Sequence, residues 1–299
     1  MRTITSFRLL FVSLMAHFDN PHTMYKECKE TVAGYSLVKP VLPDTPVHNF
    51  AVGIYAKNNT PYFIKTWENK ERDLTYYSAL YEFQVSGLLS RKFKEFSEQV
   101  RVPEAIEIVH NSDNSISFVY EYVGGFLLSK RGVSEQLRHL EKIISELVYL
   151  SSTLTKEEKS QLRSRGILFY LFCLPLCTIL SVRSNPSKWR KILKACLHCA
   201  LSLKIQRALV LSHRDLHPGN VILADNLLYM VDCEYVALTI PGFDWSDLGI
   251  FFSNNQRYAQ SMQGCSANSE FLKTYIAIHR SATSLEPNRY KQYLFATYA

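Results

Sequence analysis

The stretch HRDLHPGN, residues 213–220, places a carboxylate at Asp215 and a side-chain amide at Asn220, with a Pro-Gly pair between them. Proline and glycine in succession favour a tight loop over a helix. Two apolar segments follow at 221–223 and 228–231, and a turn through residues 224–226 joins them. This pattern predicts a β-hairpin that begins just after Asn220 and returns at Asp232.

Such a hairpin would bring Asn220 and Asp232 back to one edge, with Asp215 on the adjoining loop. Amide and carboxylate oxygens are hard ligands that suit Mg²⁺, which takes few protein ligands and shares its remaining positions with water and phosphate. The sequence therefore predicts a magnesium site at Asn220 and Asp232.

The same residues resemble a known catalytic loop. The triplet at 213–215, Asn220 five residues after Asp215, and Asp232 in VDCE are similar to the catalytic loop and metal-binding aspartate of the protein-kinase-like superfamily. The form HRDLHPGN most resembles the aminoglycoside phosphotransferase and choline kinase branch. The resemblance implies a kinase that uses ATP and Mg²⁺ to phosphorylate a hydroxyl group.

Roles for the loop residues follow from this resemblance. Asp215 is expected to accept the proton of the acceptor hydroxyl, and His217 to donate a hydrogen bond to the γ-phosphate. Asn220 and Asp232 are expected to bind Mg²⁺. His213 is expected to be a structural histidine that packs and bonds to the backbone.

A nucleotide site is expected upstream. Lys65 ends the apolar strand PYFIK, and Glu82 follows 17 residues later in a helical segment. The resemblance implies that Lys65 holds the α- and β-phosphates while Glu82 anchors Lys65. Backbone groups from Glu121 to Val123 would bond the adenine.

The loop expected to cover the phosphates departs from the family pattern. Such loops are usually rich in glycine because backbone amides must approach the phosphates closely. Here the segment PDTPVHN, residues 43–49, contains no glycine, and the first one after it is Gly53.

The hydrophobic period changes once along the chain, near Gly124 and Gly125. Before them, the pattern predicts a small antiparallel sheet with one inserted helix; the strands are expected at 35–42, 50–56, 61–66, 105–110 and 116–122, and the helix at 74–89. After them, the period is mainly helical. We therefore expect an α+β, bilobal protein-kinase-like fold, with an N-terminal extension at 1–30, a nucleotide-binding N-lobe at 31–125 and a C-lobe at 126–299. The extension is either a weak signal-like segment or an over-long start.

The short stretch of sequence between Asp232 and Asp247 limits the size of the acceptor. Protein kinases place a long activation segment after the metal-binding aspartate, whereas only 15 residues separate these two carboxylates. By resemblance, Asp247 is expected to brace the catalytic loop. The acceptor is then a small molecule, similar to an aminoglycoside, choline or a sugar. Glu234, Asp244 and Glu270 are candidates to contact a cationic acceptor.

Two alternatives stay open. Lipopolysaccharide core kinases also carry an HRDL loop and act on membrane-linked sugars, which the uncharged run at 166–182 and the basic segment at 188–194 would suit. We expect Pro175 to divide that run into two buried helices, but contact with one membrane face remains an alternative. A pseudokinase that only binds is disfavoured, because the expected catalytic residues are present.

Composition narrows the class of protein. The chain has 299 residues, 47% hydrophobic, and a net charge of +7, which suits a globular protein and is compatible with a polyphosphate ligand or a membrane surface. Its basic residues are dispersed, which predicts no nucleic-acid partner. The seven cysteines are an odd number and lie in apolar runs, so reduced thiols and a cytoplasmic location are expected, with a location at the inner face of the membrane as the alternative.

Overall fold

The computed structural model describes residues 27–41, 50–67, 74–205, 208–253, 268–282 and 288–297. The chain forms two compact units. The first unit comprises Met1–Phe126 and Ile222–Glu234, and the second comprises Leu127–Val221 and Tyr235–Ala299. The expected N-terminal extension and the phosphate-covering loop lie largely or wholly outside the described residues.

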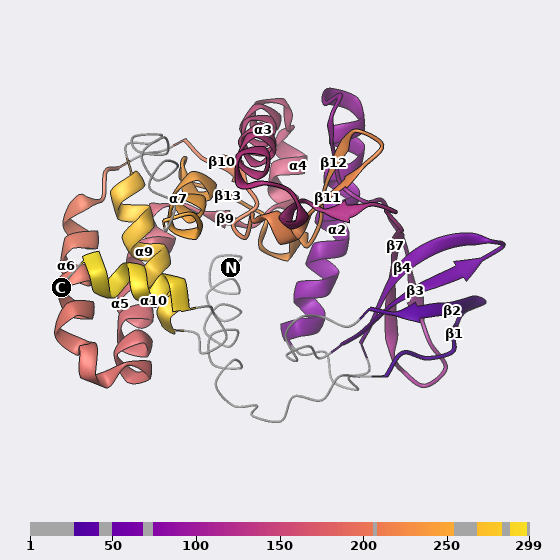
Figure 1. The fold of residues 1–299 in the computed structure, drawn as a ribbon, viewed down its shortest axis with the longest axis horizontal. Helices are drawn as coiled ribbons and strands as arrows, with labels where there is room; N and C mark the ends of the chain where they lie inside the picture. The colour runs from indigo at the N-terminus through magenta and orange to yellow at the C-terminus, as the bar shows by residue number, and fades with distance from the viewer. Residues whose placement is uncertain are drawn as a thin grey trace. The chain divides into compact units, whose positions relative to one another are not determined.

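The first unit contains a six-stranded antiparallel sheet in the order β1-β2-β3-β4-β7-β6 (Figure 1). Its strands are β1 (Thr31–Val32), β2 (Tyr35–Pro40), β3 (Phe50–Lys57), β4 (Thr60–Trp67), β6 (Ala105–His110) and β7 (Ile116–Glu121). The five strands predicted from the alternating pattern are present within two residues of their expected ends. The buried side chains of Ile64, Phe118 and Val119 form part of the core, since they lie in the two neighbouring strands β4 and β7.

Helix α2 (Leu74–Phe96) is longer than the pattern predicts. The hydrophobic pattern predicts an end at Leu89, but the helix continues to Phe96, almost two turns further. Phe93 accounts for the extension, because its side chain is almost fully buried and holds the last turns against the unit.

A second sheet explains why residues 222–234 belong to the first unit. It has the order β5-β12-β11-β8, made of β5 (Val100–Arg101), β12 (Leu227–Met230), β11 (Val221–Ala224) and β8 (Phe126–Leu127). Strand β12 pairs in parallel with β5, joining Leu228 to Val100. A side chain at Gly125 would place its Cβ 2.4 Å from the carbonyl oxygen of Leu223, so this close approach requires glycine.

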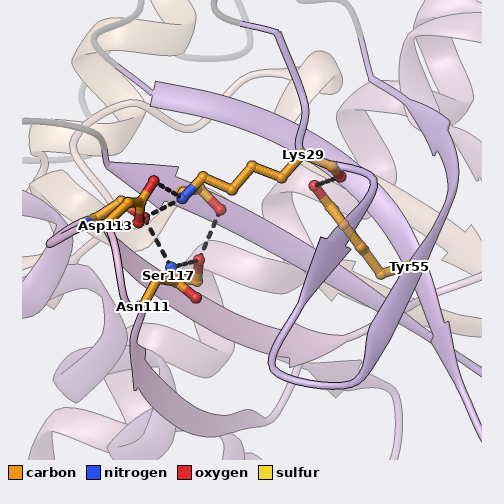
Figure 2. A network of polar contacts seen from close by, with 7 residues as sticks. Lys29, Tyr55, Asn111, Asp113 and Ser117 are labelled. Atoms are coloured by element: carbon orange, nitrogen blue, oxygen red, sulfur yellow. Dashed lines mark hydrogen bonds and ion pairs between the residues drawn. The ribbon is translucent and has the colours of Figure 1, made fainter.

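A polar network fixes the start of the described chain to the first sheet (Figure 2). The ammonium group of Lys29 contacts Asp113 and the hydroxyl of Ser115, and its carbonyl accepts a bond from the Tyr55 hydroxyl. Asn111 Nδ2 donates to the hydroxyl oxygens of Ser115 and Ser117, each at 2.9 Å. The turn between β6 and β7 is therefore tied to residues more than 80 positions earlier.

The second unit is mainly helical. Its helices are α3 (Val133–Thr153), α4 (Lys156–Gln161), α5 (Ile167–Ser184), α6 (Trp189–Ser202), α7 (Phe243–Phe251), α9 (Ser269–Ala282) and α10 (Asn288–Thr297), with the short 3-10 turns η1 (Leu128–Lys130), η2 (Pro186–Lys188), η3 (Pro218–Asn220) and η4 (Cys233–Tyr235) along the chain. A three-stranded sheet, β10-β13-β9, lies among them, formed by Val210–Ser212, Ala237–Thr239 and Ser164–Arg165. In Figure 1, α5, α6, α9 and α10 gather at one end of this unit.

The prediction that Pro175 divides the apolar run into two buried helices is wrong. Helix α5 runs without interruption from Ile167 to Ser184 and contains Pro175. Proline removes the hydrogen bond to the carbonyl of residue 171, and the packing of α5 against α6 and α9 offsets this cost. Among the residues that the structure describes, α5 is the one helix long and apolar enough to cross a membrane, and 39% of it is buried.

Candidate functional site

The first unit holds a buried ion pair at the positions expected for the nucleotide site. Strand β4 carries Lys65 and helix α2 carries Glu82; the ammonium nitrogen lies 2.8 Å from both carboxylate oxygens. Only 12% of the Lys65 side chain and 6% of the Glu82 side chain are exposed. Burial alone would lower the pKa of Lys65, but the charges of Glu82 and Asp232 raise it above its usual value. Lys65 is therefore a fixed cation.

Asp232 completes this group of charges. It lies just after β12, and its Oδ1 is 3.6 Å from the ammonium nitrogen of Lys65. The backbone at Asp232 is left-handed, with φ of 62°, an unusual conformation for a residue other than glycine. Its side chain is 39% exposed, so one carboxylate stays accessible beside a buried cation.

The candidate catalytic loop in the second unit, residues 213–220, is held by side chains that bond to its backbone. Arg214 adopts a left-handed conformation with φ of 68°. The backbone N–H groups of His213 and Arg214 donate to the two carboxylate oxygens of Asp244, at 2.9 and 2.7 Å. Asn220 closes the loop, because its Nδ2 donates to the carbonyl oxygen of Asp215 at 3.0 Å. The amide oxygen Oδ1 of Asn220 is thus the atom suited to a metal.

Asp215 is paired with a cation from a distant helix. Nη2 of Arg280, in α9, lies 2.6 Å from Oδ1 of Asp215 and donates to the carbonyl of Arg214 at 3.3 Å. Burial raises the pKa of Asp215, but Arg280 and two histidines of the loop outweigh it, so the pKa is lowered. Asp215 is ionised at neutral pH.

Arg280 also faces a second carboxylate. Its Nη2 lies 3.5 Å from Oδ2 of Asp247, and the Tyr290 hydroxyl donates to Oδ1 of Asp247 at 2.8 Å. Asp247 is almost fully buried, and this burial raises its pKa to about 6 despite the nearby guanidinium group. The arginine thus links the catalytic loop to α7 and α10.

His217 is oriented by the loop. Its Nδ1 accepts a hydrogen bond from the backbone N–H of Gly219 at 3.0 Å, and its ring stacks on Phe251 with centroids 5.9 Å apart. In the neutral ring the proton therefore sits on Nε2, which is then the donor nitrogen of the ring. A Cβ at Gly219 would lie 2.7 Å from Cε1 of the His217 ring, so a larger residue here would have to displace that ring.

Comparison with known protein families shows to which family the chain belongs. A model of the phosphotransferase enzyme family matches residues 60–278, most of the chain. The chain belongs to this family. The predicted kinase class and the predicted branch of the protein-kinase-like superfamily are confirmed. No curated protein matches the sequence.

Solved structures share the fold of this phosphotransferase. A thermostable mutant of aminoglycoside phosphotransferase APH(4)-Ia in its apo form gives a TM-score of 0.61 at 11% identity, covering 88% of this chain and 96% of that one. Spectinomycin phosphotransferase APH(9)-Ia, in complex with ADP and spectinomycin, gives 0.57 at 16% identity, covering 88% and 85%. The predicted α+β, bilobal protein-kinase-like fold is confirmed.

The structure corrects which aspartate of the phosphotransferase braces the catalytic loop. Asp247 was expected to do so, but Asp244 accepts the backbone bonds from the loop, while Asp247 faces Arg280 and Tyr290. Both aspartates stand in α7, three positions apart, so they lie on the same side of the helix about one turn apart. The position of α7 along its axis therefore decides which of them meets the backbone of the loop.

The same contacts revise the acidic residues suggested for a cationic acceptor. Asp244 is buried and used by the backbone, which removes it from that set. Glu270, on α9, pairs with His198 at 2.7 Å. Glu234 belongs to the first unit and accepts a bond from the Ser78 hydroxyl at 3.3 Å. None of these contacts points to an acceptor.

The proposed adenine segment lies at the end of β7. The backbone N–H of Glu121 donates to the carbonyl of Glu104 at 2.9 Å, and the Glu121 carboxylate accepts from the Glu104 N–H. Adenine bonds would therefore involve other backbone groups of residues 121–123. Sequence reasoning missed Arg280, which has no local motif and reaches Asp215 across 65 positions.

The cysteines hold no metal cluster in the part of the chain that the structure describes. Cys173, Cys177 and Cys199 are buried, and burial raises their pKa values above that of an ordinary thiol. Such thiols stay protonated and unreactive at neutral pH.

Proposed function

We propose that this phosphotransferase moves the γ-phosphoryl group of ATP to a hydroxyl group of a small molecule, with Mg²⁺ as cofactor. The observation that carries the proposal is the ionised carboxylate of Asp215, fixed in the loop by Asn220 and paired through Oδ1 with Arg280. Its other oxygen, Oδ2, has one long contact from Asn220 at 3.5 Å among the described residues. Oδ2 is thus suited to receive a proton.

In the proposed reaction, Asp215 accepts the proton of the acceptor hydroxyl and orients its oxygen. The acceptor oxygen forms a bond to the γ-phosphorus, the bond from that phosphorus to the β,γ-bridging oxygen breaks, and ADP leaves. His217 donates from Nε2 to the γ-phosphate. Because the transition state of phosphoryl transfer is largely dissociative, positioning by these groups matters more than the basicity of Asp215.

The first unit supplies the nucleotide groups in this proposal. Lys65 holds the α- and β-phosphates, and Glu82 keeps the lysine in place through two bonds. Backbone groups from Glu121 to Val123 bond the adenine. Asn220 and Asp232 offer the hard oxygen ligands that fit Mg²⁺, which when bound neutralises charge on the phosphates.

A small acceptor fits the chain after Asp232. The residues from 233 to 242 form η4, strand β13 and the turn into α7, so no long platform for a peptide stands in this described segment. Related folds have been solved with hygromycin B or spectinomycin, both small ring compounds. We therefore propose an aminoglycoside-like, choline-like or sugar-like acceptor.

A sugar carried by a lipid is the second candidate acceptor. The observation that favours it is the exposed apolar surface of α5 and α6, described below. A silent pseudokinase is less favoured, because Lys65, Asp215, Asn220 and Asp232 are all present and Lys65 is paired with Glu82.

Transfer of label from γ-labelled ATP into a total metabolite and lipid extract tests the proposal. We expect labelled product with the wild type and Mg²⁺, and label that appears about 10²–10⁴-fold more slowly with Asp215→Asn. Label in the aqueous phase indicates a soluble acceptor, and label in the organic phase a lipid-linked one. If both proteins bind ATP and neither transfers label, the pseudokinase is correct and the proposal fails.

A further inference from the structure

Helices α5 and α6 carry a surface whose composition is unusual for a water-exposed helix. In α6, the buried side is formed by Ile192, Ala195 and Cys199. The exposed side should then be polar. Instead, four large apolar side chains recur there at every fourth position: Trp189, Leu193, Leu197 and Leu201.

Helix α5 also has large apolar side chains on its exposed side. Its buried side includes Tyr170, Cys173 and Cys177. Its exposed side carries Leu168, Phe172, Pro175 and Ile179, with Arg183 in the last turn. Phe172 is 64% exposed and Ile179 is 66% exposed, while Leu197 and Leu201 of α6 reach 63% and 78%. Exposed apolar patches of this kind mark interaction surfaces.

The two helices belong to one packed group. Helix α5 packs against α6, and both pack against α9. Glu270 of α9 reaches α6 at His198, a side of α6 next to α9. We call the exposed apolar and basic residues of α5 and α6 the α5–α6 surface.

Charge indicates what binds this surface. Residues 159–214 contain no Asp or Glu, although the chain average would place about five there, and they contain eleven Lys or Arg. On α6, Arg190 and Lys194 alternate with the exposed leucines, and the Arg190 guanidinium group lies 5.3 Å from the Trp189 ring centroid. Arg183, Lys188 and Lys204 are also exposed. The surface is therefore apolar and cationic together.

We propose that the α5–α6 surface binds an anionic lipid bilayer. Apolar side chains would enter the boundary between headgroups and acyl chains, while the basic residues meet lipid phosphates. Tryptophan and arginine suit that depth, because each combines an apolar body with a polar end. The helices lie on the membrane, and neither crosses it.

Other occupants match the charge less well. A second copy of the chain would bring the same positive surface and repel it. The N-terminal segment 1–26 carries Arg2, Arg8 and Lys26 but only one acid, Asp19, so it offers no complementary charge. An anionic bilayer supplies both an apolar layer and negative charge.

Vesicle co-sedimentation tests this proposal independently of catalysis. The full chain is mixed with vesicles of phosphatidylglycerol and phosphatidylcholine, or of phosphatidylcholine alone. We expect binding to the anionic vesicles, with at least tenfold weaker binding to the neutral ones and a loss at high salt.

Two variants and a matched control locate the surface. Leu197→Glu with Leu201→Glu should weaken vesicle binding more than tenfold, and Arg190→Ala with Lys194→Ala roughly tenfold or more. Val148→Glu with Tyr149→Glu, at exposed positions of α3 in the same unit, should leave binding unchanged. Thermal unfolding must match the wild type in each case.

Three outcomes would overturn the proposal. The first is a wild-type protein that ignores anionic vesicles. The second is equal loss in the α3 control, which would indicate general damage. The third is a wild-type protein that elutes as a dimer in size-exclusion chromatography, together with a Leu197→Glu, Leu201→Glu variant that elutes as a monomer and binds vesicles as the wild type does. That result would assign the surface to a second copy of the chain.

Discussion

Replacing Asp244 by alanine should free the catalytic loop. The carboxylate accepts two backbone N–H groups, from His213 at 2.9 Å and from Arg214 at 2.7 Å, and all three residues are buried. In Asp244→Ala, both donors lose their acceptor in a place that water reaches poorly.

The expected loss in the free energy of unfolding follows from these two hydrogen bonds. Leaving a buried donor unsatisfied costs about 1–3 kcal/mol, so the pair predicts a loss of about 2–6 kcal/mol in the free energy of unfolding. The left-handed backbone of Arg214 is then held by fewer contacts, and Asp215 next to it should lose its fixed position. Activity should fall together with stability.

Hydrogen exchange of the peptide spanning residues 211–216 is the assay, combined with urea unfolding and kcat. We expect the two amides at 213 and 214 to exchange much faster in Asp244→Ala. A loss of this size is a large fraction of the stability of an ordinary domain, so Asp244→Asn serves as a second variant. It keeps one acceptor oxygen and should lose about half as much stability.

Asp247→Asn is the matched control, since it lies in the same helix and does not accept bonds from the loop backbone. The amides at 213 and 214 should stay protected in it. The reasoning is refuted if Asp244→Ala leaves these amides protected, or if Asp247→Asn exposes them equally.

Three further predictions rest on single contacts. Burial raises the pKa of Asp247 to about 6, so the stability that this group contributes is full below pH 4 and is lost as the pH rises through 6. In urea unfolding, Asp247→Asn should therefore gain about 3 kcal/mol relative to the wild type between pH 4 and pH 7. A difference that stays constant with pH would contradict this. Glu82→Ala should lower the free energy of unfolding by about 3–5 kcal/mol, because it leaves the buried charge of Lys65 without this partner. The double variant Lys65→Met, Glu82→Met should recover stability but not ATP binding, measured by calorimetry. Retained ATP affinity in the double variant would argue against the role of the pair. Gly219→Ala should displace the His217 ring and lower kcat roughly tenfold with little change in Tm, and unchanged kcat would remove His217 from the reaction.

Local patterns account for most of what could be predicted. The strands of the first sheet follow from alternating apolar residues, and the hairpin after Asn220 from the turn at Asp225 and Asn226, which both adopt positive φ. Lys65 and Glu82 were predicted from the family resemblance, which implies a strand lysine paired with a glutamate on the following helix.

Long-range contacts account for what could not be predicted. Arg280 reaches Asp215 from a helix that has no motif of its own, and tertiary packing alone brings it there. The choice between Asp244 and Asp247 depends on where α7 lies along its axis relative to the loop, which sequence spacing does not determine. Helix α5 continues through Pro175 because its packing against α6 and α9 offsets the cost of the proline.

The central claim, that Asp215 is the catalytic base, is tested most directly by single-turnover phosphoryl transfer in the wild type and in Asp215→Asn, with ATP affinity measured on the same samples. The acceptor in this assay is a compound of the class that receives label in the extract experiment. The account predicts that the transfer rate falls about 10²–10⁴-fold while the Kd for ATP changes less than threefold. Transfer at the wild-type rate in Asp215→Asn, with ATP bound equally well, would contradict it.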